Sequence, residues 1–157
     1  MEQEKILILG VGNLLLKDEG VGIHCIKALE KKELPEYVDL MDGGTGGLHL
    51  ISWIEGYKRI IMLDATLDNN PPGTVRLIRP RYASDFPPLM SAHEIGLRDM
   101  IEAMAISDKT PETELIVVSV EDISEVGIYL SPKVEAAVDE VVEMVISAIS
   151  RPSQAPR

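Results

Sequence analysis

The 157-residue sequence is poor in cysteine, in aromatic residues and in positive charge, and each shortage excludes something. Cys25 is the only cysteine, so no internal disulfide can form, and a reducing compartment fits the chain. Aromatic residues make up 4% of a sequence that is 45% hydrophobic, so the core has to be built from aliphatic side chains. Lysine and arginine number 15 against 26 acidic residues. The resulting net charge of −11 argues against nucleic acids and anionic membrane surfaces as partners.

Long apolar runs and targeting signals are missing as well. No run approaches the length of a transmembrane helix, and the polar residues 2–5 lead directly into an apolar segment without the pattern of a signal peptide. We therefore expect a cytoplasmic protein with no membrane partner. The length is that of one ordinary domain, and we predict a single domain over residues 1–150 with a disordered tail over 151–157.

Apolar stretches of strand length alternate along the chain with stretches of helical periodicity. The expected strands cover residues 5–10, 38–41, 59–65, 74–79 and 114–120, and the expected helices cover 20–32, 47–56, 132–150 and a segment that begins near 91. Several strands are wholly apolar, which is typical of strands buried on both faces of a parallel sheet. The pattern predicts a three-layer α/β domain with a mostly parallel sheet, in which 74–79 forms a hairpin or a flanking edge.

Carboxylates and one histidine gather where these expected strands end. Asp18 and Glu19 follow the first strand, Asp42 follows the second, Asp64 lies at the end of the third, and His93 opens a helix after a long loop. In sheets of this kind the ligand site lies beyond the carboxyl ends of the strands. We therefore expect these side chains to share one edge of the sheet.

Each of these residues also has a purely structural interpretation. Asp18 and Glu19 could cap a helix, since negative charge is favoured at a helix N-terminus, and for Asp18 alone this is the better explanation. Asp42, which precedes two glycines, could simply shape a turn. A lone histidine such as His93 is more often a surface or capping residue. Asp64 is harder to explain in this way, because a carboxylate directly after the run 60–63 loses hydration unless a charged or hydrogen-bonding group meets it.

The best-supported combination is a metal site of two carboxylates and one imidazole, built from Glu19, Asp64 and His93. Three protein ligands would leave coordination positions open for water or for a substrate group. The remaining histidines, His24 and His49, are expected on polar helix faces. Cys25 falls in an apolar stripe and is expected in the core.

A nucleotide-binding domain is the first competing hypothesis, because Gly10 and Gly12 follow a strand. The dinucleotide fingerprint fails, since Leu15 occupies the place of its third glycine. A peptidyl-tRNA hydrolase has a similar first loop, but the acidic charge and the lack of a basic groove argue against it. The glycines are instead expected to make a tight turn that brings Glu19 back over the strand ends.

Six short motifs, taken in their order and spacing, resemble the maturation endopeptidases of [NiFe]-hydrogenases. They are GVGN (10–13), KDEGVG (17–22), DGGT (42–45), LDA (63–65), PPGTV (71–75) and SAHEIGL (91–97). The resemblance covers residues 5 to about 150. It implies an α/β/α sandwich with a mixed, mainly parallel sheet. It also implies an enzyme that removes a short C-terminal extension from the hydrogenase large-subunit precursor after nickel has entered that precursor.

Carried over residue by residue, the resemblance makes Glu19, Asp64 and His93 the metal-contacting positions and gives Asp42 a role in recognition or catalysis. The nickel would come with the substrate, although another divalent metal could occupy the site. The loops 66–73 and 79–92 are expected to border the cleft. A non-enzymatic, nickel-sensing chaperone of the same precursor would use the same binding residues, and the sequence leaves this alternative open.

Overall fold

The computed structural model describes residues 4–44, 54, 56–80, 111–121 and 126–152. The elements in chain order are β1 (Ile6–Val11), η1 (Lys17–Gly20, a 3-10 helix), α1 (Val21–Leu29), β2 (Val38–Gly44), β3 (Arg59–Thr66), β4 (Val75–Ile78), β5 (Glu112–Ser119) and α4 (Pro132–Ile149). The expected helices at 47–56 and near 91 lie outside the described residues, apart from isolated positions of the first. Within the described ranges, no helix is both long enough and apolar enough to span a membrane.

The five strands form one sheet in the order β2-β1-β3-β5-β4. The pairs β1–β2, β1–β3 and β3–β5 are parallel, whereas β4 runs antiparallel to β5. The predicted mixed, mainly parallel sheet is therefore confirmed. Of the two alternatives for residues 74–79, the flanking edge is correct, because β4 pairs with β5 and not with β3, the strand that precedes it.

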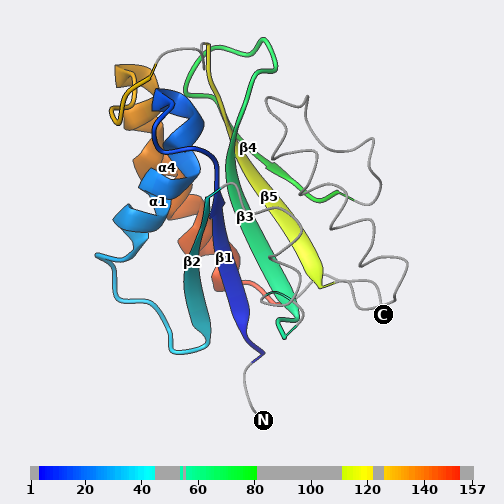
Figure 1. The fold of residues 1–157 in the computed structure, drawn as a ribbon. Coiled ribbons are helices and arrows are strands. Elements are labelled where there is room, and N and C mark those ends of the chain that lie inside the picture. The colour runs from blue at the N-terminus through cyan, green and yellow to red at the C-terminus, as the bar shows by residue number, and fades with distance from the viewer. Residues whose placement is uncertain (1–3, 45–53, 55, 81–110, 122–125, 153–157) are drawn as a thin grey trace.

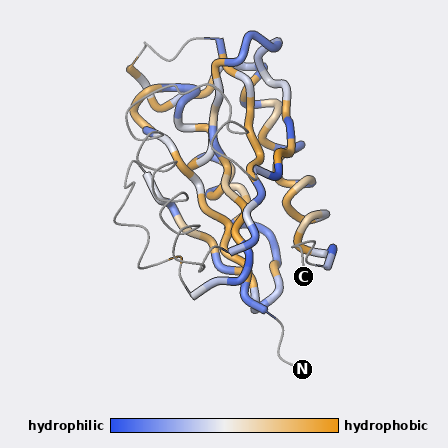
Figure 2. Tube along the Cα trace, turned by 90° about the vertical axis from the view of Figure 1, so that its right-hand side faces the viewer, coloured by the Kyte–Doolittle hydropathy of each residue, from blue (hydrophilic) through white to orange (hydrophobic). Residues whose placement is uncertain are grey.

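Aliphatic side chains fill both faces of this sheet. Alternate residues of β1 and β3, such as Ile8 and Ile61, pack with α1 and α4 on one face, while Leu9 and Met62 belong to a second cluster on the other face. Figure 1 shows α1 and α4 side by side on the same side of the sheet. In Figure 2 the hydrophobic colour runs along the central strands, and the hydrophilic colour lies mainly in the outer turns. The nearly aromatic-free composition thus still supplies a continuous core.

Two elements, α1 and β2, end three residues away from the predicted position. The helix expected from residue 20 begins as the 3-10 turn η1 and becomes α-helical at Val21, and α1 ends at Leu29. The strand expected to stop at Met41 continues through Asp42 to Gly44, because its pairing with β1 extends that far. Asp42 is therefore a strand residue and does not follow the strand.

The helix α4 starts at residue 132, as the sequence predicts, but the side chain of its N-cap residue does not cap it. Pro132 is the first helical residue and Ser131 the N-cap, yet the Ser131 side chain makes no hydrogen bond to the helix. Its Oγ donates instead to Asp18 Oδ2 at 2.7 Å, and its backbone N–H donates to Asp18 Oδ1 at 2.7 Å. Asp18 does act at a helix N-terminus, as its structural interpretation suggested, but at that of α4.

Candidate active site

Glycines let the loop after β1 pack against the carboxyl ends of the strands. Gly12 has φ +136°, and a Cβ at this position would lie 2.1 Å from the carbonyl oxygen of Glu19. A Cβ on Gly22, in the first turn of α1, would lie 2.2 Å from the carbonyl oxygen of Leu63 in β3. No side chain fits at such distances. The predicted tight turn is confirmed, and it brings η1 and the start of α1 onto the end of β3.

The two predicted carboxylate ligands are both buried at this edge. Glu19 is 2% exposed and lies in η1, which contacts β3. Asp64 is 6% exposed and lies in β3, where its Oδ1 accepts a hydrogen bond from the backbone N–H of Ala65 at 2.8 Å. The structure therefore brings together the elements that carry Glu19 and Asp64, as the strand-end argument predicted.

The alternation of β3 fixes the face on which Asp64 lies. Leu63 and Ala65 belong to the cluster under α1 and α4, and Met62 belongs to the cluster on the opposite face. Because successive side chains of a strand point to opposite faces, Asp64 shares the face of Met62. The carboxylate is thus turned away from α1 and α4, toward the side of the sheet on which Ile54 is buried.

Asp42 lies at the same edge but not beside Asp64. It pairs with Gly10 of β1, which in turn pairs with Leu63 of β3, so two strand spacings, or about 10 Å, separate Asp42 from β3. By the same alternation its side chain lies on the α1 and α4 face. Asp42 is exposed, and its Oδ1 accepts a hydrogen bond from the backbone N–H of Gly44 at 2.9 Å. This contact supplies the turn-shaping role that the sequence suggested, while a catalytic role stays a prediction.

The third predicted ligand, His93, lies outside the described residues. Among the residues that the structure does describe, no three histidine, cysteine, aspartate or glutamate side chains form a group that could hold a metal ion. Glu19 and Asp64 together offer carboxylate oxygens from two elements fixed by glycine packing. This donor set suits a divalent cation, and adding an imidazole would suit nickel or zinc.

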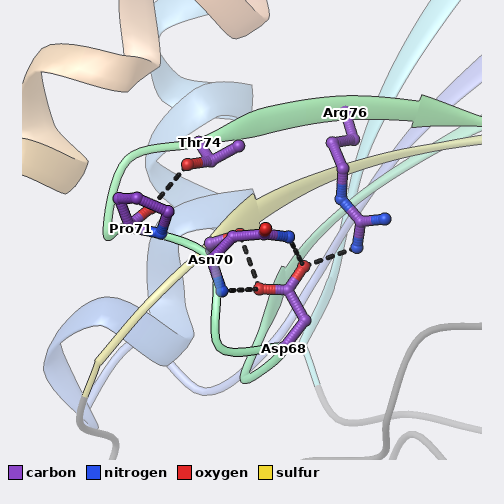
Figure 3. Close-up of polar contacts among 6 residues, drawn as sticks. Asp68, Asn70, Pro71, Thr74 and Arg76 are labelled. Carbon is purple, nitrogen blue, oxygen red and sulfur yellow. Dashed lines mark hydrogen bonds and ion pairs between the residues drawn. The ribbon is translucent and has the colours of Figure 1, made fainter.

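The loop after β3 is organised by Asp68, a residue that the sequence analysis did not single out. Its carboxylate accepts hydrogen bonds from Asn70 N at 3.1 Å, from Asn70 Nδ2 at 2.8 Å and from Ser119 Oγ at 2.8 Å, and it pairs with Arg76 (Figure 3). Burial opposes its ionisation, but these hydrogen bonds and the Arg76 charge outweigh that effect and lower the pKa of Asp68. The sequence signal was the Asp-Asn-Asn run, typical of a turn in which the aspartate bonds to the backbone two residues on.

A hollow of about 380 Å³ opens at this edge between four parts of the chain, one of which is Glu121 after β5. Lys17 and Asp18 line it from η1, Pro72 from the loop after β3, and Ser131 from the start of α4. Pro72 belongs to the first loop expected to border the cleft, but neither Glu19 nor Asp64 lines this hollow, so that expectation stays a prediction. For the second expected loop, residues 81–92 lie outside the described residues.

Three side chains, Cys25, His24 and His49, were expected to play no part in the site. The structure confirms the expected place of Cys25 and confirms that of His24 only in part. Cys25 is buried in the core, and burial raises the pKa of its thiol to about 12, so it is no nucleophile at neutral pH. His24 was expected on a polar face but is half-buried. Burial, reinforced by the nearby Lys27 charge, lowers the pKa of His24 below its usual value of 6.5. His49 lies outside the described residues.

Comparison with known proteins gives one consistent result. The family model described as hydrogenase maturation protease matches residues 23–148. The chain is 35% identical to the hydrogenase 2 maturation protease of Escherichia coli, over 92% of this chain and 90% of that protein. It is 34% identical to the hydrogenase expression/formation protein HoxM of Azotobacter vinelandii, over 100% of this chain and 82% of that protein.

A solved structure agrees with these sequence relatives. The hydrogenase maturating endopeptidase HybD from E. coli superimposes with a TM-score of 0.86 and 36% identity, over 93% of this chain and 92% of HybD. This likeness confirms the predicted α/β/α class. The buried carboxylates at the carboxyl edge, the matching family model and the relatives at more than 30% identity point the same way. The chain therefore belongs to the hydrogenase maturation protease family and is an endopeptidase of hydrogenase maturation.

Proposed function

We propose that this endopeptidase removes the C-terminal extension from a [NiFe]-hydrogenase large-subunit precursor, and that it recognises the precursor through the nickel already bound there. The observation that carries the proposal is the burial of two carboxylates, Glu19 and Asp64, on elements packed together at the carboxyl edge of the sheet. Membership of the hydrogenase maturation protease family is the reason to propose a hydrogenase precursor as the substrate. The two buried carboxylates are the reason to propose that the enzyme contacts the precursor's nickel.

Electrostatics favours a cation at this place. Moving a carboxylate out of water is costly, and a cation bound by two carboxylates on packed elements lowers that cost and reduces their mutual repulsion. Nickel accepts carboxylate and imidazole ligands, so His93 would complete the set contributed by this chain. Because three ligands leave the coordination shell incomplete, groups of the precursor would have to fill it. The free protein should accordingly bind nickel only weakly.

The residues of this chain then have distinct roles in the proposal. Glu19, Asp64 and His93 hold the precursor's nickel and so fix the position of the scissile peptide, and positioning of this kind contributes strongly to catalysis. Asp42, whose carboxylate is exposed at the same edge, is proposed as the base that takes a proton from the attacking water. Because its side chain lies on the opposite face of the sheet from that of Asp64, the scissile peptide would have to reach across the end of β1.

A cleavage assay tests the proposal. Nickel-loaded and nickel-free precursor are each incubated with the protein, and the loss of a C-terminal peptide is measured by intact mass spectrometry. We expect cleavage of the nickel-loaded precursor alone. Equal cleavage of both would refute recognition through nickel. Nickel-dependent binding without any mass loss would instead favour the chaperone alternative.

A further inference from the structure

Four large apolar side chains are exposed close together near the candidate site. Leu15 is 60% exposed, Val126 81%, Ile128 53% and Tyr129 75%. Single exposed apolar residues are common on protein surfaces and need no explanation. Here, however, they come from two segments more than a hundred residues apart in sequence, and a clustered apolar surface of this kind is typical of an interaction site.

Backbone hydrogen bonds hold these two segments in register. Leu16 and Gly127 form a parallel bridge, in which Gly127 N donates to Leu15 O at 2.7 Å and Lys17 N donates to Gly127 O at 2.8 Å. Farther along, the carboxylate of Asp18 binds both the backbone N–H and the hydroxyl of Ser131. The stretch 126–131 is thus fastened to the loop after β1 at two points. The apolar side chains are presented by a preformed surface, so little ordering would oppose binding.

An acidic hollow adjoins this surface. It has a volume of about 470 Å³ and lies between α1, the stretch 128–130 and α4. Ile128 and Tyr129 line one side, and Glu135 and Asp139 of α4 line the other. Both acids are exposed, and they add to the net charge of −11 of the whole chain. A ligand that covers the apolar side chains would therefore meet negative charge at its border.

We infer that Leu15, Val126, Ile128 and Tyr129 form a docking surface, called here the apolar rim, for a segment of the hydrogenase precursor. The segment would place apolar side chains on the apolar rim and a basic side chain in the hollow beside Glu135 and Asp139. The inference rests on the proposed function and extends it, because Leu15 lies four residues before Glu19 on the same loop. A precursor bound at the apolar rim is held beside the loop that leads to Glu19.

Two pairs of variants test the apolar rim separately from the chemistry. The first, Ile128→Ser/Tyr129→Ser, removes apolar contacts; the second, Glu135→Gln/Asp139→Asn, removes charge without altering packing. The control, Glu140→Gln/Glu143→Gln, changes two exposed acids of the same helix that do not line the hollow. Steady-state cleavage and binding of nickel-loaded precursor are measured for each, after thermal melting has shown that the variants are folded.

We expect KM and Kd to rise roughly 10-fold for Ile128→Ser/Tyr129→Ser, as for loss of an interface anchor worth about 1.4 kcal/mol, with kcat within about twofold of wild type. The Glu135→Gln/Asp139→Asn variant should bind the precursor more weakly than wild type at low salt, and its Kd should change less with salt concentration. The control should match wild type.

Three outcomes overturn the inference. Unchanged KM and Kd in both pairs would show that the precursor docks elsewhere. A fall in kcat at constant KM would show that the residues act in the chemistry. Conversion of a dimer to a monomer by Ile128→Ser/Tyr129→Ser, seen by light scattering, would make the apolar rim a self-association surface. If the wild type binds the precursor without cutting it, the proposed function fails, and the Kd comparison alone still decides the docking surface.

Discussion

The sheet buries carboxylates at both of its edges, beside arginines at the amino edge and where glycines let η1 pack on β3 at the carboxyl edge. At the amino edge, Glu114 of β5 is 1% exposed and pairs with Arg59 of β3, whose Nε donates to Oε1 at 2.8 Å and whose Nη2 contacts the same oxygen. Arg79 reaches the other oxygen at 3.5 Å, and Arg59 Nη1 donates to the carbonyl of Arg151 after α4 at 3.1 Å. Guanidinium groups of the chain itself therefore neutralise this acid.

At the carboxyl edge, Glu19 and Asp64 lie where η1 packs on the end of β3, and glycine packing brings the backbone close. The comparison teaches that burial alone does not mark a functional acid. What distinguishes the two edges is the end of the parallel sheet at which the acid lies, because ligand sites form beyond the carboxyl ends of the strands. The amino edge should therefore govern stability, and the carboxyl edge should govern activity.

Removing a charge at the carboxyl edge should have the largest effect on activity. We expect Glu19→Gln and Asp64→Asn each to lower kcat/KM by more than about 100-fold. Mutation of a residue that only hydrogen-bonds to a metal ligand typically lowers activity by about 10- to 100-fold, so the loss of a ligand itself should be larger. The free energy of unfolding should stay within about 1 kcal/mol, because the amide is isosteric and in Asp64→Asn can still accept from Ala65 N–H. Cleavage kinetics and urea unfolding measure the two quantities. Wild-type kinetics in either variant would remove that residue from the site.

His93→Ala should abolish processing while leaving the fold nearly unchanged, because an imidazole cannot be replaced by a neighbouring carboxylate without changing the metal preference. His24→Ala and His49→Ala are the matched controls and should keep wild-type cleavage. Precursor cleavage and thermal melting of the three variants decide the matter. Inactivity of a folded His24→Ala or His49→Ala, with His93→Ala active, would place the site elsewhere.

The amino edge should show the opposite pattern. Glu114→Gln leaves the buried Arg59 guanidinium without its negative partner, and we expect a loss of about 3 kcal/mol in the free energy of unfolding. Cleavage at a temperature where the variant is folded should match wild type. Arg79→Gln, which alters a more exposed contact to the same carboxylate, should cost less than about 1 kcal/mol. Equal stability of Glu114→Gln and wild type would contradict the structural role given to this pair.

The smallest effect concerns pH. Since the pKa of His24 is lowered in the folded protein, the unfolded state binds the proton more readily, and stability should fall as the pH drops below 6.5. His24→Gln removes this titration, so its melting temperature should fall less than that of wild type between pH 7 and 5.5. The difference should be no more than about 3 °C. Parallel pH profiles of the two proteins would show that His24 titrates alike in both states.

The strands and the two acids at their carboxyl ends, Glu19 and Asp64, were accessible from the sequence because both depend on local patterns. The apolar run of β3 could only be a buried strand, and Asp64 directly after it stood out for the same reason. Asp42 was misplaced relative to its strand because pairing with Gly10, and not local composition, extends β2. The bonds from Ser131 to Asp18 and the pairing of residues 15–17 with Gly127 join distant segments, and no periodicity reveals them. Glu114 was not singled out, because its significance depends on Arg59, 55 residues earlier.

The most direct test of the account is the coordination of the precursor's nickel when the protein binds. Nickel K-edge X-ray absorption is recorded for the nickel-loaded precursor alone, and after freeze-quenched mixing with wild type or with the Glu19→Gln/Asp64→Asn double variant. We predict additional oxygen and nitrogen ligands with wild type and a spectrum like that of the free precursor with the double variant. The same nickel spectrum in all three samples, together with normal cleavage by wild type, would contradict the claim that the carboxyl edge holds the substrate's metal.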